Sequence, residues 1–189
     1  MAYSMQLVRP AAEHLPSYRA ALEQGWSADT LRASEISAEE LARLQEDPVG
    51  FIARTEDREA KGPLIKLPDG SMANRIPGYT RWMWDGEFCG SINFRWQPGT
   101  SELPPHVLGH IGYAVVPWKQ RRGFATQALA LILDDAKAEA LPYAVVTTDE
   151  TNIASQRVIE SNGGVLVGRF IRPPQYASRP GLRYRIPFA

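Results

Sequence analysis

The residues best suited to chemistry lie in a basic loop that joins an apolar strand to a helix. The segment Val115–Thr126 reads VVPWKQRRGFAT, with three basic side chains before Gly123. The first N–H groups of a helix have no partner inside it, and the helix dipole adds partial positive charge at that end. Gly123 and the small Ala125 would let a phosphate come close to the backbone. The segment therefore predicts a site for a pyrophosphate or a similar anion.

The same segment also has a plainer interpretation, a solvated basic loop that caps a surface helix. The pattern that Gln120–Ala125 matches (glutamine or arginine, two free positions, glycine, one free position, glycine or alanine) arises by chance in roughly one chain of this length in five to ten. Its position between a strand and a helix favours the anion site. The chain lacks the GxxxxGK[ST] loop of nucleoside-triphosphate enzymes and the GxGxxG turn of dinucleotide-binding folds, so neither phosphate site is expected.

Hydrophobic periodicity predicts the elements that would position this loop. A strand at 110–116 ends at Pro117, and the following helix carries apolar residues at helical spacing from Ala125 to Ala136. The last part of the chain is predicted to form a buried strand, a short helix and two strands, at 143–148, 153–160, 165–171 and 182–188. An alternation of strands and helices is typical of a mixed α/β unit.

The first 54 residues are expected to form a short strand and two helices. The strand covers 5–9, and the first helix covers 11–24 with Pro16 in its first turn. A second helix is expected after Ser37, because Ser37–Glu40 has the form of a capping box. Asp47-Pro48 would end it.

A hairpin follows a long polar segment. Two apolar strands, 79–84 and 87–96, flank the turn Asp85-Gly86, which is a strong hairpin signal. The segment 55–77 is polar and rich in proline and glycine, and it is interpreted as a loop. A loop of that length within a domain is usually functional or mobile.

Length and composition exclude several classes of protein. The chain has 189 residues, of which 44% are hydrophobic and 22% charged, so we expect one domain over 1–189. Lys plus Arg and Asp plus Glu both number 21, which disfavours a dedicated nucleic-acid binder. One cysteine excludes a disulfide framework and a Cys-rich zinc site. No apolar run approaches the roughly 20 residues of a membrane span, and no signal peptide is visible. A soluble cytoplasmic protein without metal, membrane or nucleic-acid partner is expected.

Three motifs in order carry a family resemblance. They are GHIGYAVVP at 109–117, QRRGFA at 120–125 and NIASQRVIESNGG at 152–164. Together they resemble the GNAT superfamily of acyl-CoA-dependent N-acyltransferases, in particular a bacterial branch of predicted acetyltransferases. The resemblance covers roughly 79–171, whereas the first 78 residues are similar only in the order of their elements.

The resemblance implies a fold and a reaction. The fold would be α/β (α+β), with a mixed, mostly antiparallel sheet, a splayed central strand pair and helices on both faces. The reaction would move an acetyl group from acetyl-CoA, the cosubstrate, to an amine of a small molecule or protein by direct transfer. Family members often form dimers, so the resemblance allows a homodimer.

The resemblance also assigns coenzyme contacts. Main-chain groups of Val115 and Val116 would pair with the pantetheine arm, and an N–H near Val115 would stabilise the oxyanion. The loop before the helix would hold the pyrophosphate, with Lys119 or its neighbouring arginines near the 3′-phosphate. Asn152 and Ser155 would contact the coenzyme arm, although Asn152 also fits a simple helix N-cap. The implied loop contacts are Gln120, Arg121, Arg122, Gly123, Phe124, Ala125 and Thr126.

Acid and base roles stay open in the sequence. Many family members place a tyrosine, the acid for the leaving thiolate, where this chain has Ile159, so Tyr176 or water would have to replace it. His110 has an intrinsic pKa suited to a base, although a lone strand histidine is more often structural. Glu150 is the second candidate base, and a solvated loop carboxylate is its plainer interpretation. Tyr113 is expected to point into the core.

The acceptor site and the possibility of a non-enzyme also stay open. Aromatic residues and one arginine are candidates for an amine pocket, although a packed core explains most of them: Trp26, Trp82, Trp84, Arg95 and Trp96. A covalent mechanism through Cys89 is disfavoured, because no activating partner is evident. The missing tyrosine slightly favours an acyl-CoA-binding sensor without turnover. A third hypothesis, an anion-binding interaction domain, predicts binding that collapses with salt.

Overall fold

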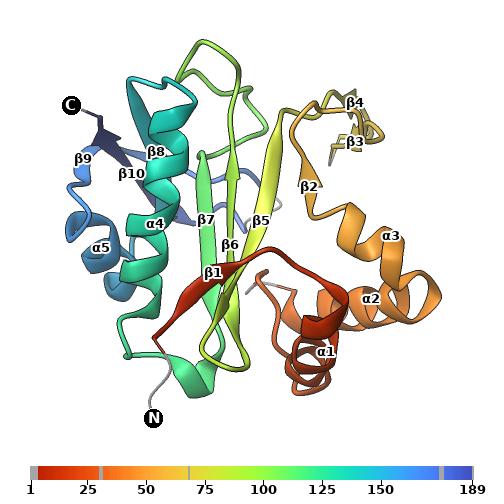
Figure 1. Cartoon of the computed structure of the whole chain (residues 1–189). Helices are drawn as coiled ribbons and strands as arrows, with labels where there is room; N and C mark the ends of the chain where they lie inside the picture. The colour runs from red at the N-terminus through yellow and green to blue at the C-terminus, as the bar shows by residue number, and fades with distance from the viewer. Residues whose placement is uncertain (1–3, 30–31, 68, 175–176, 189) are drawn as a thin grey trace.

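A mixed sheet forms the centre of the structure, a computed structural model that describes residues 4–29, 32–67, 69–174 and 177–188. Eight strands of the described chain share this sheet, in the order β1-β5-β6-β7-β8-β10-β9 with β2 beside β5 (Figure 1). A two-stranded sheet pairs β3 with β4. The strands are β1 (Gln6–Val8), β2 (Glu56–Asp57), β3 (Ile65–Lys66), β4 (Met72–Ala73), β5 (Gly78–Trp84), β6 (Phe88–Arg95), β7 (Ile111–Val115), β8 (Tyr143–Asp149), β9 (Val165–Ile171) and β10 (Pro180–Pro187).

The two central strands separate after a single point of pairing. β7 and β8 are parallel and share one residue pair, Ile111 with Val146. By contrast, β6 and β7 are antiparallel and pair along the whole of β7, and the remaining neighbours in the sheet are antiparallel as well. The expected mixed, mostly antiparallel sheet with a splayed central pair is therefore confirmed.

Helices cover both faces of the sheet. Side chains along a strand alternate between the faces, and each face carries apolar side chains that pack against helices. Met83 and Val115 contribute to a cluster with α4 (Phe124–Ala138) and α5 (Ile153–Glu160). Their neighbours Trp82 and Ala114 contribute to a second cluster on the opposite face. That face carries α1 (Leu15–Glu23), α2 (Ala33–Glu46) and α3 (Pro48–Ala53).

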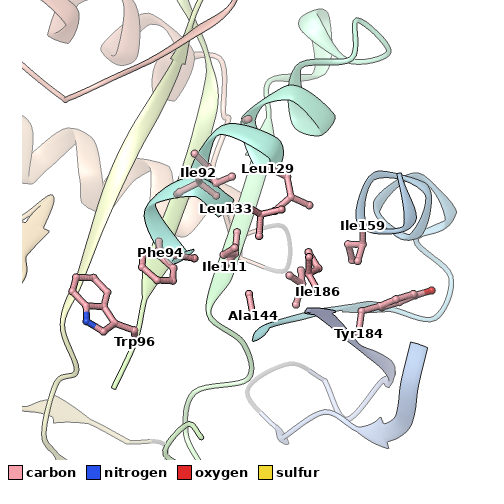
Figure 2. Packing of buried hydrophobic residues seen from close by; sticks show 14 of the residues in the cluster. Ile92, Phe94, Trp96, Ile111, Leu129, Leu133, Ala144, Ile159, Tyr184 and Ile186 are labelled. Carbon is pink, nitrogen blue, oxygen red and sulfur yellow. The ribbon is translucent and has the colours of Figure 1, made fainter. Parts of the chain in front are cut away.

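The stripe of α4 predicted from periodicity is the stripe that it buries. Ala128, Leu129, Ile132, Leu133 and Ala136 are all buried against the sheet. Figure 2 shows Leu129 and Leu133 beside strand residues of the same cluster. Burial of each leucine stabilises the fold by about 1.5–3 kcal/mol relative to exposure.

Two helix starts differ from the expectation or refine it. α2 begins at Ala33, so Ser37 is not its cap; the side chain is buried and its Oγ donates to the carbonyl of Ser34. A serine hydroxyl can satisfy itself on the preceding turn, which makes the capping-box motif ambiguous. Asp47 ends α2 and also caps α3, because its Oδ1 accepts from the N–H of Gly50 at 2.8 Å.

The segment 55–77 is more ordered than a loop. It contains β2, which pairs with β5, and the hairpin of β3 and β4. Asp69 shapes the hairpin turn, since its Oδ1 accepts from the N–H of Ser71 at 2.9 Å. Strands of two residues are too short to produce a periodic pattern, so the sequence did not predict them.

No helix of the described residues is both long and apolar enough to cross a bilayer. Two short 3-10 turns complete the elements, η1 (Ala12–His14) before α1 and η2 (Pro117–Lys119) after β7. Pro16 lies in the first turn of α1, as expected.

Candidate active site

A cavity of about 760 Å³ opens beside the splayed strands. Its walls include the end of β7, the basic loop, the first turn of α4 and the first turns of α5. Nine of the eleven residues expected to contact the coenzyme line it: Val115, Gln120, Arg121, Gly123, Phe124, Ala125, Thr126, Asn152 and Ser155. The tertiary fold thus brings the basic loop and the start of α5 to one cavity.

The hydrogen bonds between β6 and β7 leave alternate main-chain groups of β7 facing the gap between β7 and β8. The N–H of Val116 donates to Cys89 O, and the N–H of Arg95 donates to His110 O, each at 2.9 Å. Bonded and non-bonded pairs alternate along antiparallel strands, so the peptide groups of Tyr113 and Val115 face away from β6. They face β8, where the strands have separated. One such group, the carbonyl of Val115, accepts from Gln120 Nε2 at 3.4 Å.

The loop before α4 presents backbone amides without a side-chain cap. Arg121 and Gly123 both have left-handed backbone conformations, with φ of 63° and 78°. No side chain caps the helix, and a Cβ added to Gly123 would meet no heavy atom within 4 Å. The first N–H groups of α4 are therefore open to an anion, and the glycine leaves room for it.

Three cations of the loop have different environments. Arg121 and Arg122 are exposed; Arg121 and Lys119 line the cavity, whereas Arg122 does not. Lys119 is 6% exposed. Its Nζ lies 2.8 Å from both carboxylate oxygens of Asp85 and 2.6 Å from Glu87 Oε1. The ammonium group of Lys119 is therefore paired with acids of the hairpin turn, and a contact with the 3′-phosphate stays a prediction from sequence.

Val116 lies outside the cavity lining. Its side chain is fully buried in the cluster of α1 and α2. Its N–H is bonded to Cys89 O, and its carbonyl accepts from the N–H of Lys119. The main-chain groups of Val116 are therefore committed to the fold, and Val115 is the residue whose peptide group faces the gap.

Two hydroxyl groups meet in the cavity between β7 and α5. Tyr113 Oη lies 2.9 Å from Ser155 Oγ, and both residues line the cavity. Asn152 Oδ1 accepts from the N–H of Ser155 at 3.0 Å, so Asn152 is the N-cap of α5 and orients this turn. Burial raises the pKa of Tyr113 to about 12. Tyr113 was expected in the core; it contacts the core and also presents its hydroxyl to the cavity.

His110 joins β7 to β8 at the point where they begin to separate. Its main-chain N–H donates to Val145 O at 2.7 Å, and its Nδ1 accepts from the N–H of Val145 at 2.9 Å. The imidazole is fully buried. Burial, together with the charge of Arg95, lowers its pKa to about 4. The side chain is therefore neutral at pH 7, and its Nδ1 lone pair is occupied.

The other catalytic candidates lie elsewhere. Glu150 Oε1 is 3.1 Å from Arg169 Nε, and the residue does not line the cavity beside the splayed strands. Tyr176 lies outside the described residues. Ile159 is fully buried in the main core, so the position that carries a tyrosine in many relatives is filled by packing. Cys89 is buried as well, and burial raises the pKa of its thiol to about 12.

The aromatic candidates for an acceptor pocket divide in the same way. Trp82 and Trp96 are buried in the two cores. Trp84 packs its ring against His14 at 4.6 Å between centroids. Trp26 lines the first cavity and Arg95 a second one. Gly25, Ser27 and Ala33 also line the first cavity, and no motif in the sequence marked them.

The described residues contain no group of three or more His, Cys, Asp or Glu side chains placed to hold a metal ion.

Residues 9–165 match the family model of the acetyltransferase (GNAT) domain. This match covers most of the chain, which therefore belongs to the GNAT acetyltransferase family and is an N-acetyltransferase of that type. A comparison with curated proteins finds no significant match.

Solved structures with the same fold include three acetyltransferases. RimL, a ribosomal L7/L12 α-N-protein acetyltransferase in complex with coenzyme A, superposes with a TM-score of 0.64 at 14% identity over 98% of this chain and 94% of that one. The microcin C7 self-immunity acetyltransferase MccE, in complex with acetyl-CoA and AMP, has a TM-score of 0.59 at 14% identity over 97% and 92%. An enzyme from Salmonella typhimurium that modifies the N-terminal serine of L7/L12 has 0.58 at 15% identity over 98% and 96%. At these identities the likeness concerns the fold.

Proposed function

We propose that this chain transfers the acetyl group of acetyl-CoA directly to an amine in the cavity beside β7 and β8. The observation that carries the proposal is the meeting of three features in one cavity of about 760 Å³. These are the outward peptide groups of Tyr113 and Val115, the open N-terminus of α4, and the hydroxyl pair of Tyr113 and Ser155. Family membership and CoA-bound structures of the same fold support it.

Each feature has a role in this mechanism. The amides at the start of α4 bind the pyrophosphate, and the free edge of β7 pairs with the pantetheine arm. When the amine nitrogen attacks the thioester carbon, a C–N bond forms, and the N–H of Val115 stabilises the negative charge on oxygen. The C–S bond then breaks. Tyr113, hydrogen-bonded to Ser155, donates a proton to the thiolate in place of the tyrosine missing at Ile159.

The proton of the attacking amine needs a second route. His110 cannot accept it at Nδ1 without losing its bond to Val145, and Glu150 is paired with Arg169. We assign His110 a positioning role where β7 and β8 separate. Water accepts the proton of the amine, and Tyr113 regains its own proton from solvent. His110 and Glu150 as bases, Val116 and Arg122 as coenzyme contacts, a homodimer and a cytoplasmic location stay predictions from sequence.

A second function is favoured by one observation. Ile159 fills the usual tyrosine position, so an acyl-CoA-binding sensor without turnover would keep the cavity and lose the chemistry. Release of coenzyme A in the presence of a panel of amines distinguishes the two. Turnover with any amine excludes the sensor.

Thermal unfolding with and without acetyl-CoA tests the coenzyme site. A ligand at about 100 times its Kd stabilises by about 2.7 kcal/mol, which corresponds to a rise of roughly 5–10 °C for a chain of this size. Gly123→Glu places a carboxylate in the proposed pyrophosphate site and should abolish this rise.

Gly99→Glu is the matched control for that variant. Gly99 also has a positive φ of 76°, and a Cβ there meets nothing within 4 Å, but it lies in the loop that follows β6. It should carry the same backbone strain and keep the full response to acetyl-CoA. No response in the unaltered protein would contradict the proposed function.

A further inference from the structure

A second cavity, of about 280 Å³, lies on the face of the sheet that also carries α1 to α3. Its floor is formed by β5 and β6, and its rim by the segment after α3, the chain after β4 and the loop before β7. The segment 55–77 thus builds part of a cavity wall. No step of the mechanism above uses this cavity.

The lining of this cavity has an excess of positive charge. Three arginines contribute to it, against one acid, Asp57, and His106 also lines the cavity. The carboxylate of Asp57 already accepts from the N–H groups of Lys61 and Gly62, at 2.8 and 2.9 Å. The arginines are Arg54, Arg75 and Arg95.

Arg95 is the innermost of these cations by position in the sheet. It belongs to β6 and is half-buried, and its Nη2 donates to Asn93 Oδ1 at 2.6 Å, which fixes the guanidinium over the strand. A guanidinium offers five N–H donors in a planar fork that suits carboxylates and phosphates, so it can bind an anion in addition to Asn93.

Gly112 lies next to Arg95 and directly precedes Tyr113, which belongs to the proposed acetyl-transfer site. A Cβ at Gly112 would lie 3.4 Å from the side-chain amide of Asn93 and 3.6 Å from Arg95 Nη2. The next residue, Tyr113, turns its peptide group and its hydroxyl toward the first cavity. Consecutive residues of β7 therefore border the two cavities: Gly112 lies beside Arg95 and Asn93, which line the second cavity, and Tyr113 lines the first.

We propose that the acceptor is a small amine that also carries a carboxylate or phosphate group, and that Arg95 binds this group. The proposal rests on the proposed function, because it names the acceptor class for the same reaction. A volume of about 280 Å³ is at the lower end of the range for small-molecule sites, which favours a small acceptor over a protein chain. The anion would hold the acceptor by one end and direct its amine past Gly112.

The test compares matched amines in an assay of coenzyme A release. Propylamine, β-alanine and 2-aminoethylphosphonate each carry a primary amine on a two-carbon chain, which ends in a methyl, a carboxylate or a phosphonate group. We expect kcat/KM to be roughly 10- to 100-fold higher for an anionic amine than for propylamine, the range of one charge-assisted hydrogen bond. The preferred member of the anionic pair distinguishes carboxylate from phosphate.

Arg95→Gln should remove this preference and leave the thermal response to acetyl-CoA intact. Its matched control is Arg185→Gln, on an exposed strand position of β10 outside both cavities, which should keep the preference. If Arg95→Gln does not fold, as judged by its response to acetyl-CoA, Arg75→Gln at the rim is measured instead and should weaken the preference.

The outcomes separate the two proposals. Equal kcat/KM for charged and neutral amines, or acetylation of peptide amines alone, would overturn the anionic small acceptor and keep the coenzyme site. Binding of acetyl-CoA without acetylation of any of the three amines would overturn it too. Absence of any response to acetyl-CoA would reject the proposed function itself.

Discussion

Tyr113 contributes both its main chain and its side chain to the proposed site. Its peptide group faces the gap between β7 and β8, and its hydroxyl lies 2.9 Å from Ser155 Oγ. Because burial raises its pKa to about 12, Tyr113 stays protonated near neutral pH. It can therefore act as a proton donor and not as a base. At the residue scale, this is the side chain best placed to replace the absent tyrosine at Ile159.

Tyr113→Phe should lower kcat roughly 100- to 10,000-fold, because the thiolate loses its proton donor. Binding of acetyl-CoA, measured by thermal shift, should change little, since the ring and the main chain remain. Tyr184→Phe is the control, because Tyr184 is buried in the same core and bonds Glu160 at 3.2 Å outside the cavity. Equal kcat values for the two variants would exclude Tyr113 as the acid.

His110 predicts a dependence of stability on pH. Its folded pKa of about 4 lies below the ordinary 6.5, so the unfolded chain binds the proton more readily. The stability it contributes is present above pH 6.5 and is lost as pH falls toward 4. Between pH 7.5 and 5 the expected loss is about 2 kcal/mol.

Urea unfolding of the parent chain and of His110→Asn at the two pH values checks this. Asparagine can keep an acceptor near Val145 without titrating, so its loss of stability should be smaller by about 2 kcal/mol. A pH dependence unchanged by the substitution would show that other groups cause it.

At the scale of elements, the β5–β6 turn and the turn η2 are joined by one buried cation. Lys119 Nζ contacts Asp85 and Glu87, which holds the hairpin against the chain that leads into the basic loop. Burial alone would raise the pKa of Asp85, but hydrogen bonds and charge from Lys119 hold it below its usual value. The ion pair thereby supports the loop that presents the amides of α4.

Lys119→Met should lower the free energy of unfolding by about 3 kcal/mol, because it leaves Asp85 buried without its cation. The double variant Lys119→Met/Asp85→Asn should recover a large part of that loss. Urea unfolding of the single and double variants measures both values. If the double variant is less stable than Lys119→Met, the loss arises from packing and not from the uncompensated charge.

At the scale of the whole molecule, the sheet separates two cavities that the proposals use together. The splay of β7 and β8 opens one, and the residues on the α1–α3 side of β5 and β6 form the floor of the other. Each face also carries its own hydrophobic cluster, and the first cavity is bounded by residues from both sides, Trp26 and Ala33 as well as α4 and α5. A net charge of zero for the chain conceals the cationic excess of the second cavity.

Local patterns predicted most elements, and nine of the eleven residues that the family resemblance assigned to the coenzyme line one cavity. The stripe of α4, the Asp85-Gly86 hairpin and the loop before Gly123 depend on neighbours within a few residues, so periodicity and turn chemistry reveal them. Patterns failed where short strands left no period, as in 55–77, and where one serine fitted two hydrogen-bonding roles, as at Ser37.

What the sequence determined by itself is the order of elements and the basic loop before α4, because both follow from spacing along the chain. Only the tertiary structure decided which side chains meet. Tyr113 and Ser155 are 42 residues apart, and their contact depends on the register of β7 and the packing of α5. Arg95, Asn93 and Gly112 likewise converge through the pairing of β6 with β7. Such contacts are made by strand register and face, which no local pattern specifies.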